Sequence, residues 1–243
     1  MIHYHGLPIT PASAAAEVLS SRHAFVSFAH PDQLPIALEV CQSFALDNGA
    51  FSAWRSGNPV TDWTLYYEWV GGIKRIPGFD FACIPDLIDG DEDANDELLV
   101  QWPHEKHLSA PVWHMHESIG RFYRLCNTWP RVAIGSSGDF ATVGAPDWWT
   151  RIAEALNAVC DDFGLPPCRL HGLRMLNPEV FTRLPLASAD STNIGQNVGI
   201  DSHWKGNYMP PDKAWRARVL ASRIESHNAA AKWHRQPTQE SLI

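Results

Sequence analysis

Two aspartates in this 243-residue chain follow short runs that have the composition of buried strands. Asp47 comes directly after the apolar run at 44–46, and Asp190 ends the small-residue run at 186–189. At the carboxyl end of a strand, a carboxylate can attack an anomeric carbon, hold a metal ion or move a proton. The sequence therefore makes Asp47 and Asp190 the leading candidates for catalytic residues.

Each of these aspartates also has a purely structural interpretation. Asp47 begins an Asp-Asn-Gly sequence, which is typical of a plain turn at a strand end, because Gly49 lets the backbone turn sharply. Asp190 could instead cap a following helix. The segment Asn-Ile-Gly-Gln-Asn at 193–197 does not have the pattern of a helix, so the position at a strand end favours a functional role.

Other polar residues and glycines recur after apolar runs along the chain. In chain order they are His3, His5, Asn48, Asp86, His114, His116, Gly135, His171 and Gly172. Asp86 precedes a run of acids at 89–93, which is typical of a solvated helix start, whereas Asp86 itself is nearer the strand. This regular placement predicts that these side chains meet at one end of the fold.

Eight short runs are predicted to be strands, with helices between them. The strands are Ile2–His5, Ala24–Phe28, Ser43–Leu46, Phe79–Ile84, Pro111–Met115, Val132–Ile134, Arg169–Gly172 and Leu186–Ala189. The predicted helices are 11–20, 61–73, 91–102, 118–127, 147–163, 177–183 and 212–232, and Gly164 is expected to end the fifth of them. Several strand runs are continuously apolar, as in parallel strands buried on both faces.

Alternating strands and helices imply parallel βα units with right-handed crossovers. Eight such units close a (β/α)8 barrel of the TIM type, and 243 residues agree with the ~250 that such a barrel takes. No linker divides the chain, so we expect a single domain over 1–243. An open doubly wound sheet is the alternative, but no GxGxxG turn follows the first strand.

The charge of the chain is uneven. The net charge is −8, which argues against a protein that grips nucleic acid with its whole surface. Residues 199–243 carry seven Lys/Arg against four Asp/Glu, a local charge of +3, and tryptophans and a tyrosine are interleaved over about 199–235. This segment is either a polynucleotide-contacting edge or a terminal helix whose tryptophans pack on the barrel.

Targeting and cofactor signals are not found in the sequence. No apolar run reaches 18 residues and the first residues do not resemble a secretory signal, so we expect a cytoplasmic protein that does not use a membrane. The five cysteines include no CxxC pair, so we expect neither a zinc knuckle nor a redox motif, and no bound cofactor or metal.

Four segments together resemble the tRNA-guanine transglycosylase superfamily. Residues 44–51, Phe-Ala-Leu-Asp-Asn-Gly-Ala-Phe, resemble its Asp-Ser-Gly-Gly-Phe segment, and Ala-Asp-Ser-Thr at 189–192 resembles its late nucleophilic Asp segment. Residues 81–86 and 132–135 fall where the family places a base-reading Asp and a glycine-bearing strand end. The resemblance is spread over roughly residues 1–200.

The resemblance implies a (β/α)8 barrel that exchanges guanine in a polynucleotide for a 7-deazaguanine. It makes Asp190 the nucleophile that forms a covalent enzyme–nucleotide intermediate and Asp47 the acid/base, much as in a retaining glycosidase. It also makes Asp86 the residue that reads the guanine edge. The same resemblance implies that Asn48, Gly49, Phe51, His114, Gly135 and Gly172 line the base site, with the two later glycines leaving room for a flat base.

The chain departs from the tRNA enzymes in ways that bear on its substrate. It lacks their cysteine-rich zinc site, it is much shorter, and Asn48 and Ala50 replace the usual Ser and Gly. These differences favour the short DNA-modifying branch, often encoded by phages, so we expect DNA rather than tRNA as the substrate. The target base must leave the stack, and an accessory protein that opens the duplex is a possible partner.

Two other hypotheses fit the same residues. A metal-dependent hydrolase could use His3 and His5 on the first strand together with His114, His171 and Asp190, since residues two apart on a strand share a face; His116 pairs with His114 in the same way. The plain alternative is that these histidines bond to loops. A non-catalytic binding module, which would bind a 7-deazaguanine without exchange, is the third hypothesis.

Overall fold

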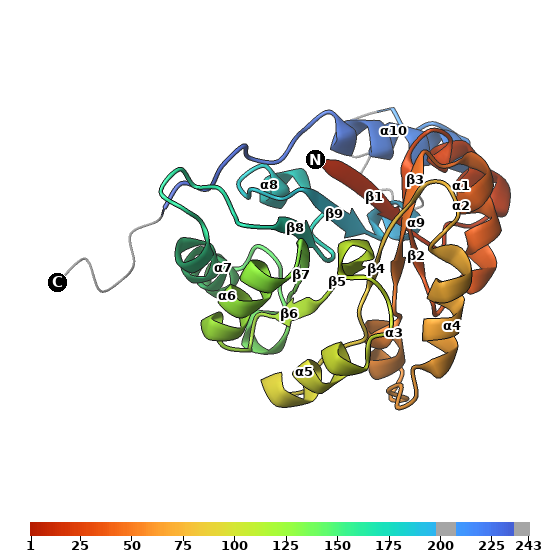
Figure 1. The fold of residues 1–243 in the computed structure, drawn as a ribbon. Coiled ribbons are helices and arrows are strands. Elements are labelled where there is room, and N and C mark those ends of the chain that lie inside the picture. Colours follow the sequence, from red (N-terminus) through yellow and green to blue (C-terminus); the bar gives the residue numbers. More distant parts are fainter. Residues whose placement is uncertain (198–207, 236–243) are drawn as a thin grey trace.

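A ring of parallel strands forms the centre of the computed structural model, which describes residues 1–197 and 208–235 (Figure 1). The strands are β1 (Ile2–Gly6), β2 (His23–Ser27), β3 (Ser43–Asp47), β4 (Phe79–Cys83), β5 (Ser109–Ala110), β6 (Val112–His114), β7 (Arg131–Gly135), β8 (Arg169–Gly172) and β9 (Ser188–Ser191). Their order is β5-β4-β3-β2-β1-β9-β8-β7-β6, and every pair is parallel.

The two edge segments of this sheet, β5 and β6, are one strand interrupted at Pro111. Ala110 of β5 pairs with Cys83 of β4, whereas Val112 of β6 pairs with Ala133 of β7. Proline has no N–H to donate to a ladder, so the pairing changes from one neighbour to the other at this residue. Eight strand positions therefore close the predicted (β/α)8 barrel, and all eight predicted strands are confirmed.

Helices connect the strands and cover the outside of the barrel (Figure 1). They are α1 (Ala12–Leu19), α2 (Leu34–Val40), α3 (Ala50–Arg55), α4 (Thr64–Ile73), α5 (Glu92–Gln101), α6 (Ile119–Thr128), α7 (Pro146–Val159), α8 (Pro178–Phe181), α9 (Asn193–Asn197) and α10 (Lys213–Glu225). All seven predicted helices are present, while α2, α3 and α9 were not predicted. The expectation that 193–197 is not helical was wrong.

Two predicted helix ends were also wrong. Helix α7 ends at Val159, and Gly164 lies in the turn beyond it with φ +81°. A Cβ at Gly164 would collide with the carbonyl oxygen of Trp233. This glycine therefore allows the backbone at Trp233 to approach closely, and it does not end the helix. Helix α10 ends at Glu225 rather than near 232. The chain beyond it runs to the turn at Gly164, where the N–H of Trp233 donates to the carbonyl of Gly164.

The inside of the barrel is filled by aromatic side chains. Tyr4, Phe25 and Phe81 are buried there, with ring centroids about 6 Å apart in each pair. Below them, Arg131 makes two 2.9 Å hydrogen bonds to Asp80 and lies over the ring of Phe81. This plug closes the barrel under the carboxyl ends of the strands.

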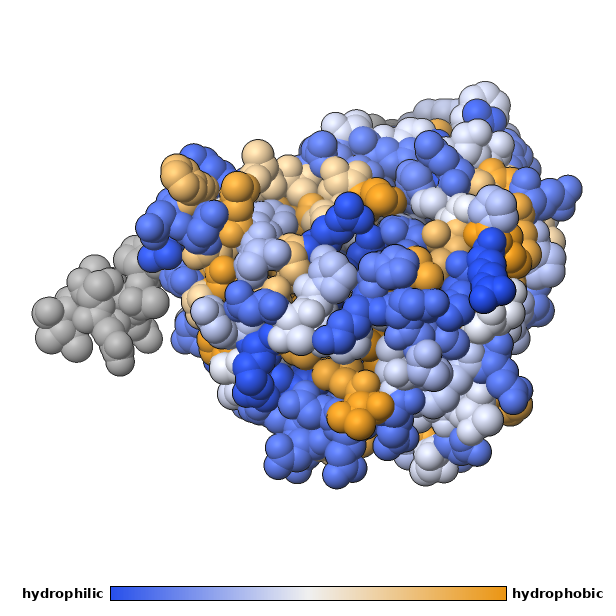
Figure 2. All heavy atoms as spheres, viewed as in Figure 1, coloured by the Kyte–Doolittle hydropathy of each residue, from blue (hydrophilic) through white to orange (hydrophobic). Residues whose placement is uncertain are grey.

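Alternate strand residues pack against the helices and form the larger hydrophobic core. Val26 of β2, Leu46 of β3 and Ile134 of β7 are fully buried in it, and Trp148 and Ile152 of α7 belong to the same core. The surface is correspondingly polar: in Figure 2, hydrophilic side chains cover most of the face shown and hydrophobic ones form small scattered groups. Among the described residues, no helix is long and apolar enough to cross a membrane.

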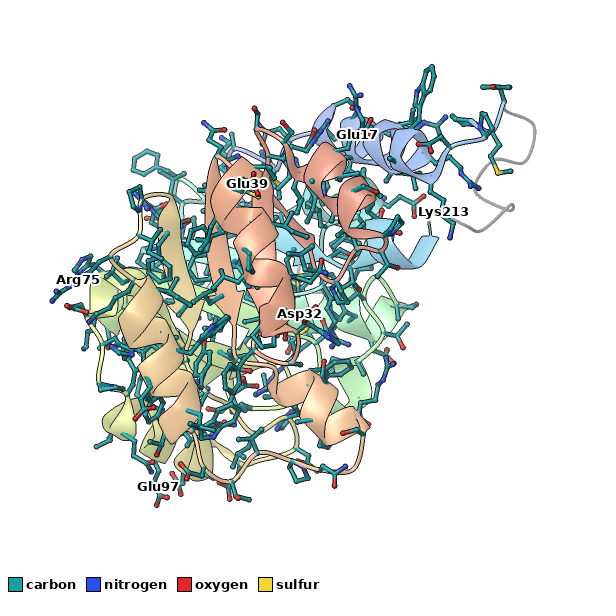
Figure 3. All side chains as sticks on the ribbon, turned by 90° about the vertical axis from the view of Figure 1, so that its right-hand side faces the viewer. Glu17, Asp32, Glu39, Arg75, Glu97 and Lys213 are labelled. Carbon is teal, nitrogen blue, oxygen red and sulfur yellow. The ribbon has the colours of Figure 1, made fainter. Side chains whose placement is uncertain are left out.

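Helix α10 contacts β1 from the outside of the barrel and holds it in place. It lies beside α1, where Arg218 pairs with Glu17 at 3.1 Å (Figure 3 labels Glu17 and Lys213 on the two helices). Glu225 at its end accepts hydrogen bonds from His5 and Arg22 at 2.8 and 2.9 Å. Burial raises the pKa of Glu225, but these two hydrogen bonds hold it below its ordinary value.

The Arg131–Asp80 pair makes a testable contribution to stability. We expect Arg131→Met to lower the free energy of unfolding by about 3 kcal/mol, because it leaves the partly buried Asp80 without its cation. Urea unfolding measures the change. The double variant Arg131→Met/Asp80→Asn should recover part of it; a double variant as unstable as the single one would contradict this account.

Candidate active site

Asp47 ends β3 and is held at the barrel mouth by two donors. The hydroxyl of Ser27, its Cα partner on β2, donates to Asp47 Oδ2 at 2.7 Å, and the backbone N–H of Gly49 donates to the same oxygen at 3.1 Å. Gly49 has φ +79°, and a Cβ there would lie 3.0 Å from the nitrogen of Ala29. The expected turn at Gly49 is therefore present, and it orients the carboxylate.

The surroundings of Asp47 favour its protonated form. Burial raises the pKa of Asp47 to about 6, the hydrogen bond from Ser27 lowers it, and the nearby carboxylates of Asp190 and Asp86 raise it. A carboxyl with a pKa close to neutral can give and take a proton at physiological pH. This is the property that a general acid/base requires.

Asp190 lies on β9, and its Cα pairs with that of Tyr4 in the aromatic layer. It is 5% exposed. Its Oδ1 accepts the backbone N–H of Arg174 at 3.0 Å and lies 3.3 Å from Nε2 of His171, without the alignment of a hydrogen bond. The hydrogen bond that the described residues donate to this carboxylate is accepted by Oδ1.

His171 lies beneath Asp190 as part of the barrel interior. Its Nδ1 is 2.8 Å from the hydroxyl of Ser188, and its ring packs against Phe25 and Phe81 with centroids 5.2 and 5.1 Å away. Burial lowers the pKa of His171, while its contact with Asp190 raises it. Its lowered pKa favours a neutral imidazole, which adds no positive charge beside Asp190.

Arg174 spans the mouth above these carboxylates. Its Nη2 donates to the carbonyl of Ser136 at 2.7 Å, and its guanidinium carbon lies 4.2 Å from the ring centroid of Phe51. Burial lowers the pKa of Arg174, while Asp190 and Asp47 raise it. Arg174 is therefore the cation that offsets two crowded carboxylates.

Asp86 is fixed separately by two donors. Its Oδ1 accepts from Nδ2 of Asn48 at 2.6 Å, and its Oδ2 contacts Nε2 of His114 at 2.8 Å. An ionised carboxylate can only accept, so Nε2 of His114 is the donor to an ionised Asp86, and Nδ1 of His114 is buried without a hydrogen-bond partner among the described residues. Asn48 also donates to the carbonyl of Ile84 and accepts from the N–H of Ala50, so these expected site residues form one connected group.

A buried ionic network supports this group from behind. Glu117 accepts the backbone N–H of His114 at 2.9 Å, Nδ2 of Asn95 at 2.9 Å and Nη1 of Arg121 at 2.6 Å. These three donors satisfy a carboxylate that is only 3% exposed. The loop that carries Asp86 is tied to the same network, because Asn95 accepts from the N–H of Leu87.

The two later glycines have different surroundings. Gly135 faces the mouth, where a Cβ would lie 3.1 Å from Nδ1 of His114, so it keeps space clear beside that ring. The expectation that Gly172 leaves room for a base was wrong. A Cβ at Gly172 would meet Met175 at 2.8 Å and Leu186 at 3.0 Å, both in the outer core, so this glycine serves packing.

The expected grouping of His3 and His5 with the mouth residues was wrong as well. Both point out of the barrel: His3 Nε2 contacts the carbonyl of His227 at 3.0 Å, and His5 Nε2 contacts Glu225. They flank Tyr4, which points inward, because side chains alternate along a strand. Within residues 1–197 and 208–235, no group of three or more His, Cys, Asp or Glu side chains is arranged to hold a metal ion.

His116 makes hydrogen-bonding contacts with two loops, as expected under the alternative in which the histidines bond to loops. Its Nδ1 lies 2.7 Å from the hydroxyl of Ser137 and its Nε2 lies 2.9 Å from the carbonyl of Gly90. Its ring stacks on His114 with centroids 5.6 Å apart. It is therefore a neighbour of the site that shapes two of its loops.

The basic, aromatic segment predicted over about 199–235 has its described aromatic residues in two kinds of environment, buried and exposed. Trp233 is buried and donates to Asn157, as expected for packing on the barrel, whereas Tyr208 and Trp215 are 78% and 61% exposed. Lys205 and Trp204 lie outside the described residues. The described part thus contains both packed and exposed aromatic residues, and the polynucleotide edge stays a prediction.

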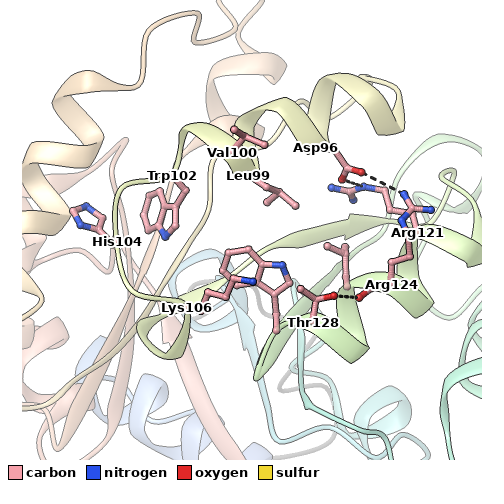
Figure 4. Close-up of a pocket in the computed structure, with 11 residues that line it drawn as sticks. Asp96, Leu99, Val100, Trp102, His104, Lys106, Arg121, Arg124 and Thr128 are labelled. Atoms are coloured by element: carbon pink, nitrogen blue, oxygen red, sulfur yellow. Dashed lines mark hydrogen bonds and ion pairs between the residues drawn. The ribbon is translucent and has the colours of Figure 1, made fainter.

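A separate groove lies on the outside of the barrel between α5 and α6 (Figure 4). It has a volume of about 470 Å³, and its walls include Trp102, Trp129 and Lys106, whose ammonium lies 4.7 Å from the ring centroid of Trp129. None of the candidate catalytic residues lines it. The chemistry expected from the sequence belongs to the mouth of the barrel instead.

Two residues at the barrel mouth, Ser27 and Arg174, were not predicted from the sequence. Ser27 ends β2 just as Asp47 ends β3, so the same search for polar residues after apolar runs could have found it. Arg174 carries no such signal. It lies two residues beyond β8 in a left-handed backbone conformation, φ +59°, that sequence patterns do not mark for arginine.

Comparison with known proteins relates the chain to others by fold alone. No family model matches the sequence, and no curated protein matches it. A mutant tryptophan synthase alpha-subunit from Pyrococcus furiosus has a TM-score of 0.52 at 8% identity, covering 92% of this chain and 95% of that one. A second structure of the alpha-subunit from this hyperthermophile has a TM-score of 0.50 at 9% identity, covering 93% and 96%.

The raised pKa of Asp47 predicts a pH-dependent stability. Above about pH 7 the carboxylate is charged in both states but poorly solvated in the native one, so its ionisation costs roughly 1–2 kcal/mol. The native protein therefore loses stability as pH rises from about 4 to about 6. We expect Asp47→Asn to raise the free energy of unfolding by this amount above about pH 7 and to change it little near pH 4.

Urea unfolding of the variant and the parent at both pH values is the measurement. The exposed Asp32 provides a matched control, since Asp32→Asn should leave the pH dependence unchanged. A gain for Asp47→Asn of equal size at both pH values would mean that burial of the charge is not its cause.

Proposed function

We propose that this chain is an enzyme, a transglycosylase that exchanges guanine for a 7-deazaguanine base in a polynucleotide, with DNA favoured over tRNA. The observation that carries the proposal is the convergence of Asp47 and Asp190 at one barrel mouth in unlike surroundings. Asp47 has a raised pKa, whereas Asp190 lies beside the Arg174 cation. Two carboxylates whose environments differ in this way suit one proton carrier and one nucleophile.

The proposed first half-reaction uses both groups at once. Oδ2 of Asp190 attacks C1′ of the target nucleotide, the bond from C1′ to guanine breaks, and the protonated Asp47 gives its proton to the leaving base. The product is a covalent ester between Asp190 and the sugar. We assign to Asp86, which is held by Asn48 and His114, the hydrogen bonds from the guanine edge.

The second half-reaction reverses these roles. Asp47, now a carboxylate, takes the ring N–H proton of the incoming 7-deazaguanine, whose nitrogen attacks C1′ and releases Asp190. Atoms and charge balance without an added cofactor. The resemblance of residues 44–51 and 189–192 to the transglycosylase segments supports this assignment.

The substrate choice rests on the parts of the family pattern that this sequence lacks. Its five cysteines do not form the zinc site of the tRNA enzymes. We therefore propose DNA as the substrate, with the target base extruded from the stack and an accessory protein that opens the duplex as a possible partner.

The test is incorporation of radiolabelled guanine or a 7-deazaguanine into guanine-containing DNA and, separately, tRNA, in the presence of a chelator. We expect Asp190→Asn to abolish both incorporation and the covalent protein–DNA adduct seen after denaturation. Asp47→Asn should slow exchange by about 10²–10⁴-fold, the usual contribution of a general acid/base.

The exposed Asp139, on the loop after β7, is the control position, because Asp139→Asn removes a carboxylate near the mouth without touching the pair. Full exchange activity in both Asp190→Asn and Asp47→Asn would contradict the carboxylate mechanism. Binding of a 7-deazaguanine by the parent protein with no exchange on any nucleic acid would instead support a binding module.

A further inference from the structure

The guanidinium of Arg174 occupies a defined slot at the barrel mouth. Its central carbon lies over the ring of Phe51, 4.2 Å from the ring centroid, and its Nη2 donates to the carbonyl of Ser136 at 2.7 Å. The carboxylates of Asp190 and Asp47 are its charged neighbours. The slot therefore offers an aromatic face, a carbonyl acceptor and two carboxylates to a flat group that carries N–H donors.

A guanine ring has the chemistry that this slot accepts. Its amino-substituted edge contains the same unit as a guanidinium, one carbon bonded to three nitrogens, in a plane that stacks on aromatic rings. A base stacked on Phe51 with this edge toward Ser136 would make the contacts that Arg174 makes now. The side chain and the base therefore compete for one place.

The backbone of Arg174 is consistent with a residue held there for function. Its φ of +59° is unfavourable for any residue with a Cβ and costs roughly 1 kcal/mol. In this conformation the backbone N–H of Arg174 donates to Asp190 at 3.0 Å. The strain thus places the N–H on the nucleophile and the side chain in the slot.

We infer that Arg174 is an internal stand-in for the substrate base: its guanidinium fills the base slot of the unliganded protein, and a guanine-type base binds by displacing it from Phe51 and Ser136. The identity of the base rests on the proposed function. The competition itself rests only on the contacts of Arg174.

Self-occupation lowers the apparent affinity for the base. If the slot is open in a fraction of the molecules, the observed dissociation constant is the intrinsic one divided by that fraction. Removal of the side chain removes this factor. Glycine is the suitable replacement, because it accepts a positive φ and keeps the N–H that Asp190 accepts.

The experiment measures equilibrium binding of free guanine and of hypoxanthine, which lacks the amino group, by isothermal titration calorimetry. We expect Arg174→Gly to bind guanine about tenfold more tightly than the parent, as for a slot that is open about a tenth of the time, and to gain the same factor for hypoxanthine, which should bind more weakly than guanine to both proteins. Phe51→Ala should weaken guanine binding in both backgrounds. Arg183→Ala, which removes a guanidinium stacked on Trp149 at 5.2 Å, is the matched control and should bind like the parent.

Thermal unfolding establishes that each variant is folded. Equal or weaker guanine binding by a folded Arg174→Gly would overturn the inference, as would a gain that Phe51→Ala does not reverse. The incorporation assay separates this result from the proposed function: tighter base binding without exchange would leave the slot assigned and the transglycosylase refuted, and exchange without tighter binding would do the opposite.

Discussion

Repulsion among carboxylates is the constraint that organises the mouth of this barrel. Asp47, Asp86 and Asp190 lie close enough for the last two to raise the pKa of the first, and burial removes most of the water that would screen them. Asp47 accepts a hydrogen bond from a hydroxyl and has a raised pKa. Asp86 is held by an amide and an imidazole, and Asp190 accepts an N–H and lies near the guanidinium of Arg174. Three identical groups thereby acquire three different reactivities.

The rest of the barrel supplies the rigidity that such crowding needs. The aromatic plug of Tyr4, Phe25 and Phe81 leaves no space into which the carboxylates could withdraw. Behind Asp86, the Glu117 network is fully hydrogen bonded, so the loop after β4 is fixed by partners that never touch a substrate. Helix α10 holds β1 from outside through Glu225. The strain at Arg174 can persist because its surroundings determine it.

The sequence predicts the framework better than the details. The eight strands are evident because strands buried on both faces are short apolar runs, and the aspartates at their ends follow from the barrel geometry. The short helices α2 and α3 escape prediction, since seven and six residues are too few to establish a helical period. His3 and His5 show a different difficulty, because both faces of β1 are buried and the sequence does not say which faces inward. Arg174 escapes prediction because its place at the mouth depends on a left-handed backbone conformation that sequence patterns do not mark for arginine.

The barrel is one sheet whose two edges, β5 and β6, meet at Pro111. From β3 through β2 and β1 to β9 the ladder is unbroken, so the spacing of Asp47 and Asp190 is fixed by continuous backbone pairing. The contact between Asp86 and His114, by contrast, crosses the line where these edges meet, since Asp86 follows β4 and His114 lies on β6. A small movement along this line would change the contact between Asp86 and His114, while the continuous backbone pairing kept the spacing of Asp47 and Asp190. Under the proposed function, adaptation to different bases and exchange of the glycosidic bond would then rest on different parts of one ring.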